Sequence, residues 1–376
     1  MTERIARFLA ENRPETPCLV VDLDVIAEAY DLLRWHLPLA RVYYAVKANP
    51  AAEIVAMLER KGANFDVASR GEIELCLANG ITAARMSFGN TIKKEKDIAF
   101  AHRVGLRLFA FDSASELDKL ARAAPGAWVF CRILVACAGA EWPLSRKFGC
   151  APSMAIDLLR RARDLGLDPY GVSFHVGSQQ TDLAQWDGAV ASAAQMFSLL
   201  AETDIDLRMI NIGGGFPAHY RGAVPKIDGY AEAVMSAITR HFGNKLPEII
   251  IEPGRSLVGD AGVIQSEVVL IADKGGGDGR RWVYLDVGKF NGLAETMDES
   301  IKYRIETPGR DGASAPVILA GPTCDSADIL YEHTEYRLPL GLEIGDKVEI
   351  LSTGAYTASY ASVGFNGFSP IRTYCI

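Results

Sequence analysis

The fold is indicated most clearly by residues 42–80, VYYAVKANPAAEIVAMLERKGANFDVASRGEIELCLANG. It holds two short apolar runs, VYYAV (42–46) and NFDVA (64–68), and each is followed by a segment with helical spacing, AAEIVAMLERKG (51–62) and GEIELCLANG (71–80). A glycine lies at the end of both helical segments, as is common just after a helix C-terminus. Apolar runs that alternate with helices in this way are typical of a parallel α/β fold.

Six more runs of the same kind follow along the chain: RMSFG (85–89), LRLFAF (106–111), WVFCRILV (128–135), YGVSFHV (170–176), RMINI (208–212) and EIIIE (248–252). Eight β–α units in about 230 residues predict a TIM-like (β/α)₈ barrel, with an open doubly wound sheet as the alternative. The barrel is favoured because polar residues follow the runs, and a barrel brings all its strand ends to one mouth. These residues are Lys47, Asp66, Asn90, Asp112, Arg132, His175, Gly213 to Gly215, Glu252 and Arg255.

The C-terminal third has a different pattern, in which strand-like runs are joined by Gly, Pro and Asp turns without long helices. These runs are GVIQSEVVLIADK (262–274), RRWVYLDVG (280–288), APVILAGPTCD (315–325) and DKVEILSTGAY (346–356). They predict an all-β C-terminal domain. The strand-like segment TPCLVVDLDVI (16–26) precedes the first barrel unit, and we expect it to join the β domain. The predicted domains are therefore a barrel over 24–260 and a β domain over 1–23 plus 261–376.

Charge and cysteine content narrow the function classes. The chain has 376 residues, of which 49% are apolar, and its 39 basic against 47 acidic residues give a net charge of −8. A nucleic-acid partner is therefore not expected. The seven cysteines contain no Cys-x-x-Cys pair, so we expect neither a disulfide framework nor a metal site. No apolar stretch reaches the roughly 18 residues that span a bilayer, and we expect a cytoplasmic protein without a membrane partner.

Three groups at the predicted mouth suggest one cofactor. Lys47 follows a strand, where partial burial would make its amine nucleophilic, although a lysine that merely caps the strand is the simpler interpretation. The glycines of NIGGGFP (211–217) form either a tight turn or a concave row of backbone N–H groups for an anion. In EPGR (252–255), Arg255 would bind a phosphate, and Glu252 would pair with Arg255 or with a ring nitrogen. One cofactor, pyridoxal 5′-phosphate (PLP), needs all three groups: a lysine for its aldehyde, a site for its phosphate and a carboxylate for its ring nitrogen.

Other polar residues have roles that the sequence alone leaves open. His175 is either a structural histidine or the residue that lies against the cofactor ring, and Ser178 would then contact the phosphate. In the C-terminal third, Cys324 is either a buried thiol or a reactive one beside Asp325, and Tyr356 is either a core aromatic or a site residue.

A set of motifs in sequence order gives a family resemblance. The motifs are YYAVKAN (43–49), FDVASRGE (65–72), HVGSQ (175–179), IGGGFP (212–217), EPGR (252–255), GPTCDSAD (321–328) and GAYT (354–357). From about residue 16 to 370, the chain resembles the fold-type III PLP-dependent decarboxylases of basic amino acids, especially the ornithine and bacterial lysine/ornithine decarboxylases. The resemblance implies an alanine racemase-like barrel, a β domain and a head-to-tail homodimer whose active sites both subunits share.

The resemblance also implies residue roles. Lys47 would form the Schiff base with PLP, Glu252 would pair with the pyridine nitrogen, and His175 would stack on the ring. The phosphate would be bound by Ser178, Gly213, Gly214, Gly215, Arg255 and Tyr356, while Asp66, Glu72 and Arg132 would line the cofactor site. From the other subunit, Cys324 would protonate the α-carbon of the substrate, and Asp325 would bind its distal ammonium.

The implied reaction is decarboxylation of L-ornithine to putrescine, as in polyamine biosynthesis. The family pattern places a second carboxylate of the enzyme near the distal ammonium of the substrate, and a different reach of that carboxylate would also admit L-lysine, which gives cadaverine. That second carboxylate lies in GLAETMDESIKY (292–303), where we favour Glu295 over Asp298 and Glu299. Diaminopimelate decarboxylase is the nearest alternative. A racemase is disfavoured by Glu252, since arginine usually faces the ring nitrogen there. The remaining alternative is a non-catalytic homologue that acts as a regulatory binding protein.

Overall fold

The chain folds into two compact units. The computed structural model describes residues 1–135, 140–142, 147–275 and 279–376. The barrel unit contains residues 27–217 and 225–254, and the β unit contains residues 1–26, 218–224 and 255–376. The sequence suggested residues 1–23 and 261–376 for the β domain, whereas the C-terminal part of the β unit starts at Arg255 and the unit also takes in the short segment 218–224.

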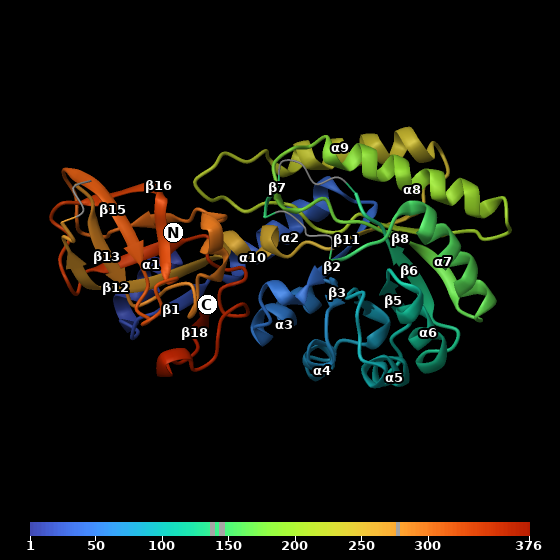
Figure 1. Cartoon of the computed structure of the whole chain (residues 1–376), viewed down its shortest axis with the longest axis horizontal. Helices are drawn as coiled ribbons and strands as arrows, with labels where there is room; N and C mark the ends of the chain where they lie inside the picture. The colour runs from blue at the N-terminus through green and yellow to red at the C-terminus, as the bar shows by residue number, and fades with distance from the viewer. Residues whose placement is uncertain (136–139, 143–146, 276–278) are drawn as a thin grey trace. The chain divides into compact units, whose positions relative to one another are not determined.

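The barrel unit is a closed ring of eight parallel strands, as predicted (Figure 1). The order around the ring is β10-β11-β2-β3-β4-β5-β6-β8. The strands are β2 (Ala40–Ala45), β3 (Asn64–Val67), β4 (Met86–Phe88), β5 (Leu108–Phe111), β6 (Trp128–Arg132), β8 (Asp168–Ser173), β10 (Met209–Asn211) and β11 (Glu248–Ile251). Each of the eight apolar runs in the sequence contains all or most of one of these strands. The closed ring rules out the open doubly wound sheet.

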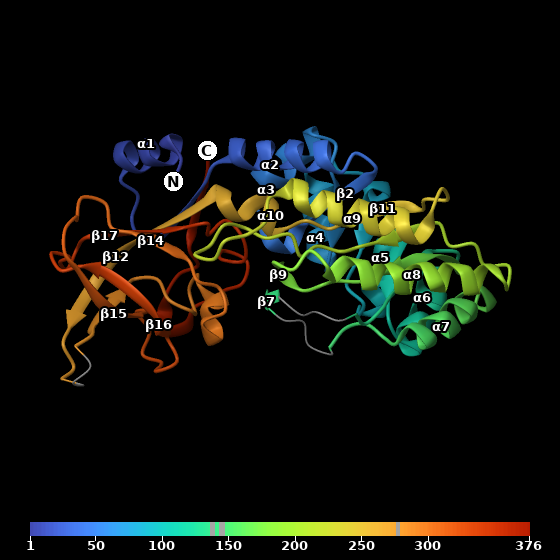
Figure 2. The same ribbon diagram turned by 90° about the horizontal axis from the view of Figure 1, so that it is seen from above.

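Helices cover the ring from outside (Figure 2); the first precedes β2, and each of the others follows a barrel strand. They are α2 (Leu23–His36), α3 (Ala52–Arg60), α4 (Arg70–Ala78), α5 (Glu95–Arg103), α6 (Ala114–Ala123), α7 (Pro152–Asp164), α8 (Gln185–Ala201) and α9 (Ile227–Phe242). Serine side chains cap two of them, because the hydroxyls of Ser69 and Ser113 accept the N–H groups of Glu72 and Glu116. Gly62 and Gly80, which follow α3 and α4, have positive φ, as expected for helix ends.

The barrel interior is filled by side chains from several strands. Its cluster contains Tyr43, Leu108, Ala110, Phe130, Met209 and Ile250. All six are buried, and Ile250 is 1% exposed. The interior is therefore a packed core that supports the strand ends on which the site is built.

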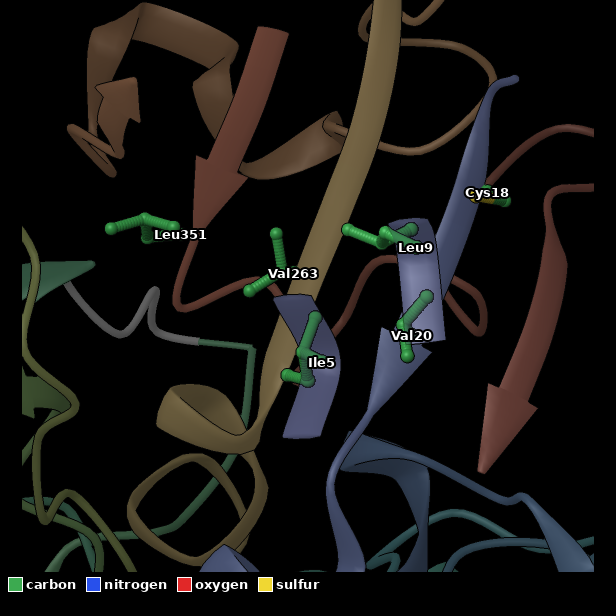
Figure 3. Packing of buried hydrophobic residues seen from close by; sticks show 6 residues of the cluster. All are labelled: Ile5, Leu9, Cys18, Val20, Val263 and Leu351. Atoms are coloured by element: carbon green, nitrogen blue, oxygen red, sulfur yellow. The ribbon is translucent and has the colours of Figure 1, made fainter. Parts of the chain in front are cut away.

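The β unit contains an eight-stranded sheet with a short helix on it. Its elements are α1 (Glu3–Asn12), β1 (Cys18–Val21), α10 (Arg255–Val258), β12 (Gly262–Ala272), β13 (Arg281–Leu285), β14 (Arg304–Glu306), β15 (Ser314–Ala320), β16 (Ile329–Pro339), β17 (Lys347–Leu351) and β18 (Arg372–Cys375). As predicted, the N-terminal strand joins this sheet, where β1 pairs with β12 and β18. Ile5 and Leu9 of α1 pack on Val20 and Val263 (Figure 3).

Across the described ranges, no helix has both the length and the apolar character needed to cross a bilayer.

The barrel core gives the first testable prediction. Ile250→Ala should lower the free energy of unfolding by about 2–5 kcal/mol, because it leaves a cavity among side chains that cannot fully collapse. Urea denaturation measures this change. The control is Leu246→Ala, since Leu246 is 41% exposed and its truncation should cost much less. Equal losses for the two variants would contradict the proposed core.

Candidate active site

A cavity of about 250 Å³ lies in the barrel unit where the strands end. Its lining residues come from sequence-distant loops and strands: Lys47, Asp66, Ala68, Gly89, Asn90, Phe130, Arg132, Phe148, Ser173, Phe174, His175 and Glu252. Six of the polar residues singled out at the strand ends are among them. Asp112 is not, because its carboxylate accepts the N–H of Gly149 at 2.8 Å. The barrel thus brings one amine, two carboxylates, a guanidinium and an imidazole to one cavity.

The lysine of the cavity is paired with a buried carboxylate. Lys47 lies in the short helix η1 (Val46–Ala48), directly after β2, and its Nζ is 3.4 Å from Asp66 Oδ2. Asp66 is only 3% exposed, whereas the Lys47 side chain is 48% exposed. Gly89 gives the carboxylate its space, because a Cβ there would collide with it. Asp66 Oδ1 is buried and has no hydrogen-bond partner among the described residues, so it can accept a donor from a bound group.

Glu252 is held at the end of β11 by an asparagine. Asn211 donates its amide N–H to Glu252 Oε1 and accepts the N–H of Gly213 at 2.9 Å, which fixes the amide orientation. Burial raises the pKa of Glu252 to about 7, and the negative charge of Asp66 adds to this, against the opposite effect of Lys47. Ionisation of Glu252 at neutral pH would therefore be favoured by a cationic partner.

His175 is a neutral ring in this cavity. Burial, followed by the positive charges of Arg132 and Lys47, lowers the pKa of His175 to about 3. Its Nδ1 accepts the N–H of Gly177 at 3.0 Å, which assigns the ring proton to Nε2. A neutral, oriented imidazole suits packing against a flat ring better than proton donation.

The glycine triplet forms a cradle that no other residue fits. A Cβ at Gly213 would lie 2.5 Å from the carbonyl oxygen of Phe174, and at Gly214 it would lie 2.7 Å from that of Glu252. Gly213 and Gly215 also have positive φ. Because Gly213 already donates its N–H to Asn211, Gly214 and Gly215 are the candidate anion donors of the triplet.

Two other predicted cofactor residues lie outside the cavity lining. Ser178 lies on the short strand β9 (Ser178–Gln180), which pairs with β7 (Ala140–Trp142). Glu72 accepts the N–H of Ala68 with Oε2, so it orders the loop after β3.

Arg255 is buried in the β unit and strongly paired. Its guanidinium makes two hydrogen bonds to Glu295, at 2.6 and 2.7 Å, and a third to the hydroxyl of Tyr220 at 2.7 Å. The ring of Tyr356 lies 4.9 Å from the guanidinium carbon, at cation–π distance. Tyr356 itself has a positive φ of 57°, an unusual conformation for an aromatic residue.

The three acids considered for substrate binding have different surroundings. Glu295 is buried against Arg255, unlike the open carboxylate that the sequence suggested. Glu299 accepts the backbone N–H groups of Glu332, His333 and Thr334; although burial would raise its pKa, these bonds lower it to about 2. Asp298 has a positive φ and lines a surface groove.

Cys324 and Asp325 lie in an exposed loop after β15. The N–H of Cys324 donates to Asn366 Oδ1, and Asp325 Oδ1 accepts the N–H of Ala327. Buried Asp328 holds the same loop by accepting both the N–H and the hydroxyl of Thr323.

Sequence reasoning missed three residues that contribute to these sites. Asn211 was not singled out because nothing in a strand sequence shows where a side-chain amide points. Phe148 lines the cavity, and the centre of its ring lies 5.1 Å from the guanidinium carbon of Arg132. It was missed because it is far in sequence from the predicted strand ends. Tyr220 belongs to the short segment that the β unit takes in.

The cavity residues fit PLP, for which they supply Lys47, a half-buried Glu252 and, at Asp66 Oδ1, a buried acceptor without a partner among the described residues. The glycine triplet lies outside the cavity lining, next to Glu252 and His175.

Comparisons with known proteins agree with this fit. Residues 23–259 match the family model described as "Pyridoxal-dependent decarboxylase, pyridoxal binding domain". A lysine/ornithine decarboxylase of Selenomonas ruminantium is 37% identical over 98% of this chain and 91% of its own. A solved structure described as SrLDC in complex with PLP and cadaverine has a TM-score of 0.89, at 35% identity over 100% of this chain and 94% of the other. The lysine/ornithine decarboxylase of Vibrio vulnificus with cadaverine also has a TM-score of 0.89, at 30% identity over 100% and 99%.

The raised pKa of Glu252 predicts a pH effect on the cofactor-free protein. Between pH 4.5 and about 7, the native state binds more protons than the unfolded chain, so stability falls as pH rises. Glu252→Gln should remove this contribution, of up to about 3 kcal/mol. Urea denaturation at several pH values measures it. The exposed control Glu53→Gln should keep the wild-type slope, and an unchanged slope in Glu252→Gln would contradict the assignment.

The glycine cradle gives a second prediction. Gly213→Ala should weaken PLP binding at least tenfold, since a Cβ meets backbone at a positive φ. Equilibrium titration of the cofactor-free protein checks this. Gly188→Ala, in the middle of α8 with open space around it, is the matched control and should leave PLP affinity unchanged. Wild-type affinity in Gly213→Ala would argue against the cradle.

Proposed function

The chain belongs to the pyridoxal-dependent decarboxylases and decarboxylates a basic amino acid with PLP, and from that premise we propose L-ornithine and L-lysine as its substrates. The products would be putrescine and cadaverine, the diamines of polyamine biosynthesis. The observation that carries the proposal is the presence of Lys47 and Glu252 on one cavity. Support for the substrate class comes from the relatives, since the Vibrio vulnificus enzyme binds cadaverine.

When bound, PLP withdraws electrons from the α-carbon of an amino acid, which makes loss of the carboxylate feasible. The chain's own residues bind and orient. Lys47 is the proposed covalent attachment point, and Glu252 would hold a proton on the ring nitrogen as an ion pair. His175, neutral and fixed by Gly177, would pack on the ring face. Asp66 would accept a hydrogen bond from the bound group through its Oδ1 atom.

The phosphate end would be held by backbone and side-chain donors. Gly214 and Gly215 are the proposed N–H donors of the cradle, and Ser178 would add its hydroxyl. Arg255 would make charge-assisted hydrogen bonds, while Tyr356 packs on its guanidinium.

In a homodimer, acidic side chains would bind the distal ammonium of the substrate. Cys324 of the partner subunit would return a proton from Sγ to the α-carbon, and Asp325 of the partner subunit would bind the distal ammonium. Asp298 is the proposed second carboxylate, because Glu299 is bound to three backbone N–H groups and Glu295 to Arg255. An exposed aspartate at this point can tolerate both a five-carbon and a six-carbon diamino acid.

Parallel assays with ornithine, lysine, arginine and meso-diaminopimelate test the proposal. We expect diamine formation from ornithine and lysine, because two acids facing the distal end favour an ammonium and repel the second carboxylate of diaminopimelate. Release of carbon dioxide from diaminopimelate alone, or from arginine alone, would contradict the proposed substrates.

Asp325→Asn should raise KM for ornithine and lysine by about 10- to 100-fold, since a hydrogen bond to a charged group contributes about 1.5–3 kcal/mol. Steady-state kinetics at saturating PLP measures this. Asp311→Asn, at an exposed position elsewhere in the β unit, should behave as wild type. An unchanged KM in Asp325→Asn would remove that residue from substrate binding.

A further inference from the structure

Arg255 is fixed by a buried carboxylate. Arg255 and Glu295 are each 4% exposed, and both carboxylate oxygens accept hydrogen bonds from the guanidinium, at 2.6 and 2.7 Å. An arginine side chain has many rotamers, and this two-point contact with a carboxylate selects one orientation of its planar fork. Removal of one partner of such a buried pair leaves the other charge uncompensated.

The pair is part of a larger aromatic enclosure. The Tyr220 hydroxyl accepts a hydrogen bond from the same Arg255 nitrogen, Nη1, that bonds to Glu295. Tyr220 in turn packs edge-on against Tyr303, with ring centroids 5.3 Å apart. The face of the guanidinium meets Tyr356. All these contacts restrict the same side chain, so the enclosure is built around the orientation of Arg255.

Glu295 is poorly placed to bind substrate as well. Both of its oxygens are engaged by Arg255, and its side chain is 6% exposed. Asp298, three residues later in η4 (Ala294–Glu299), is exposed. These two acids of η4 therefore differ, since Glu295 is buried against Arg255 and Asp298 is open to solvent.

We propose that Glu295 is a positioning residue, which holds Arg255 for the phosphate of PLP and takes no part in substrate recognition. This inference rests on the proposed role of Arg255 in phosphate binding. Because the Arg255–Glu295 pair is neutral overall, the phosphate is recognised through oriented N–H donors more than through net positive charge. Loss of Glu295 therefore affects the phosphate end of the cofactor selectively.

The test compares the affinities of the cofactor-free protein for PLP and for pyridoxal, which lacks the phosphate. Glu295→Gln should weaken PLP binding by about 10- to 100-fold, because it removes the negative charge and replaces one of the two acceptor oxygens with an N–H donor that faces the guanidinium. It should change pyridoxal binding less than twofold. At saturating PLP, its KM for ornithine and lysine should stay near the wild-type value. Asp298→Asn is the matched control, with wild-type affinity for both cofactor forms.

Other outcomes would overturn the inference. They are unchanged PLP affinity in Glu295→Gln, equal losses for PLP and pyridoxal, or a raised KM with PLP affinity intact, which would return Glu295 to substrate binding. If Glu295→Gln does not fold, the same comparison is made with Glu295→Asp, whose shorter side chain should lose part of the PLP preference, and with Tyr220→Phe, which should lose less. No loss of that preference in either variant would likewise overturn the inference.

Arg255→Met separates this inference from the proposed function. A lost preference for PLP over pyridoxal in Arg255→Met supports the phosphate role of Arg255, and Glu295→Gln then tests the positioning role alone. An unchanged preference in Arg255→Met would instead contradict the proposed phosphate site.

Discussion

The chemistry of this protein depends on the closure of its barrel. Eight parallel strands that close into one ring must end at one rim, so residues from distant parts of the chain meet there. Here that rim holds Lys47 beside Asp66, with Glu252 on the same cavity. The charges of Asp66 and Lys47 act in opposite directions on the pKa of Glu252, which burial raises.

The balance of charges explains why the cavity suits a cofactor with a cationic ring nitrogen. Glu252 has a raised pKa, and the neighbouring His175 stays neutral, so little in the cavity compensates an ionised Glu252 except Lys47 and Arg132. Asp66 has an acceptor atom without a partner among the described residues. A ligand that brings a proton and a positive charge satisfies these groups. The glycine triplet lies next to them, since a Cβ at Gly214 would lie 2.7 Å from the carbonyl oxygen of Glu252.

The sequence predicted the barrel well, because strongly apolar runs report buried parallel strands and the polar residues after them mark the rim. It predicted less about side-chain partners. Glu295 was expected to face the substrate, whereas the structure pairs its carboxylate with Arg255. Spacing along a chain does not show which way a side chain turns, so this contact could not be predicted. Asn211 was missed for the same reason. The segment 218–224 joined the β unit through contacts that no local pattern reveals.

The proposed chemistry requires that Lys47 carries the cofactor. The most direct measurement is borohydride reduction of the PLP-loaded protein, followed by proteolysis and mass spectrometry of the peptides. We expect one phosphopyridoxyl group, on the peptide that contains Lys47. Stable labelling of another lysine, such as the buried Lys93, with Lys47 unmodified would contradict it.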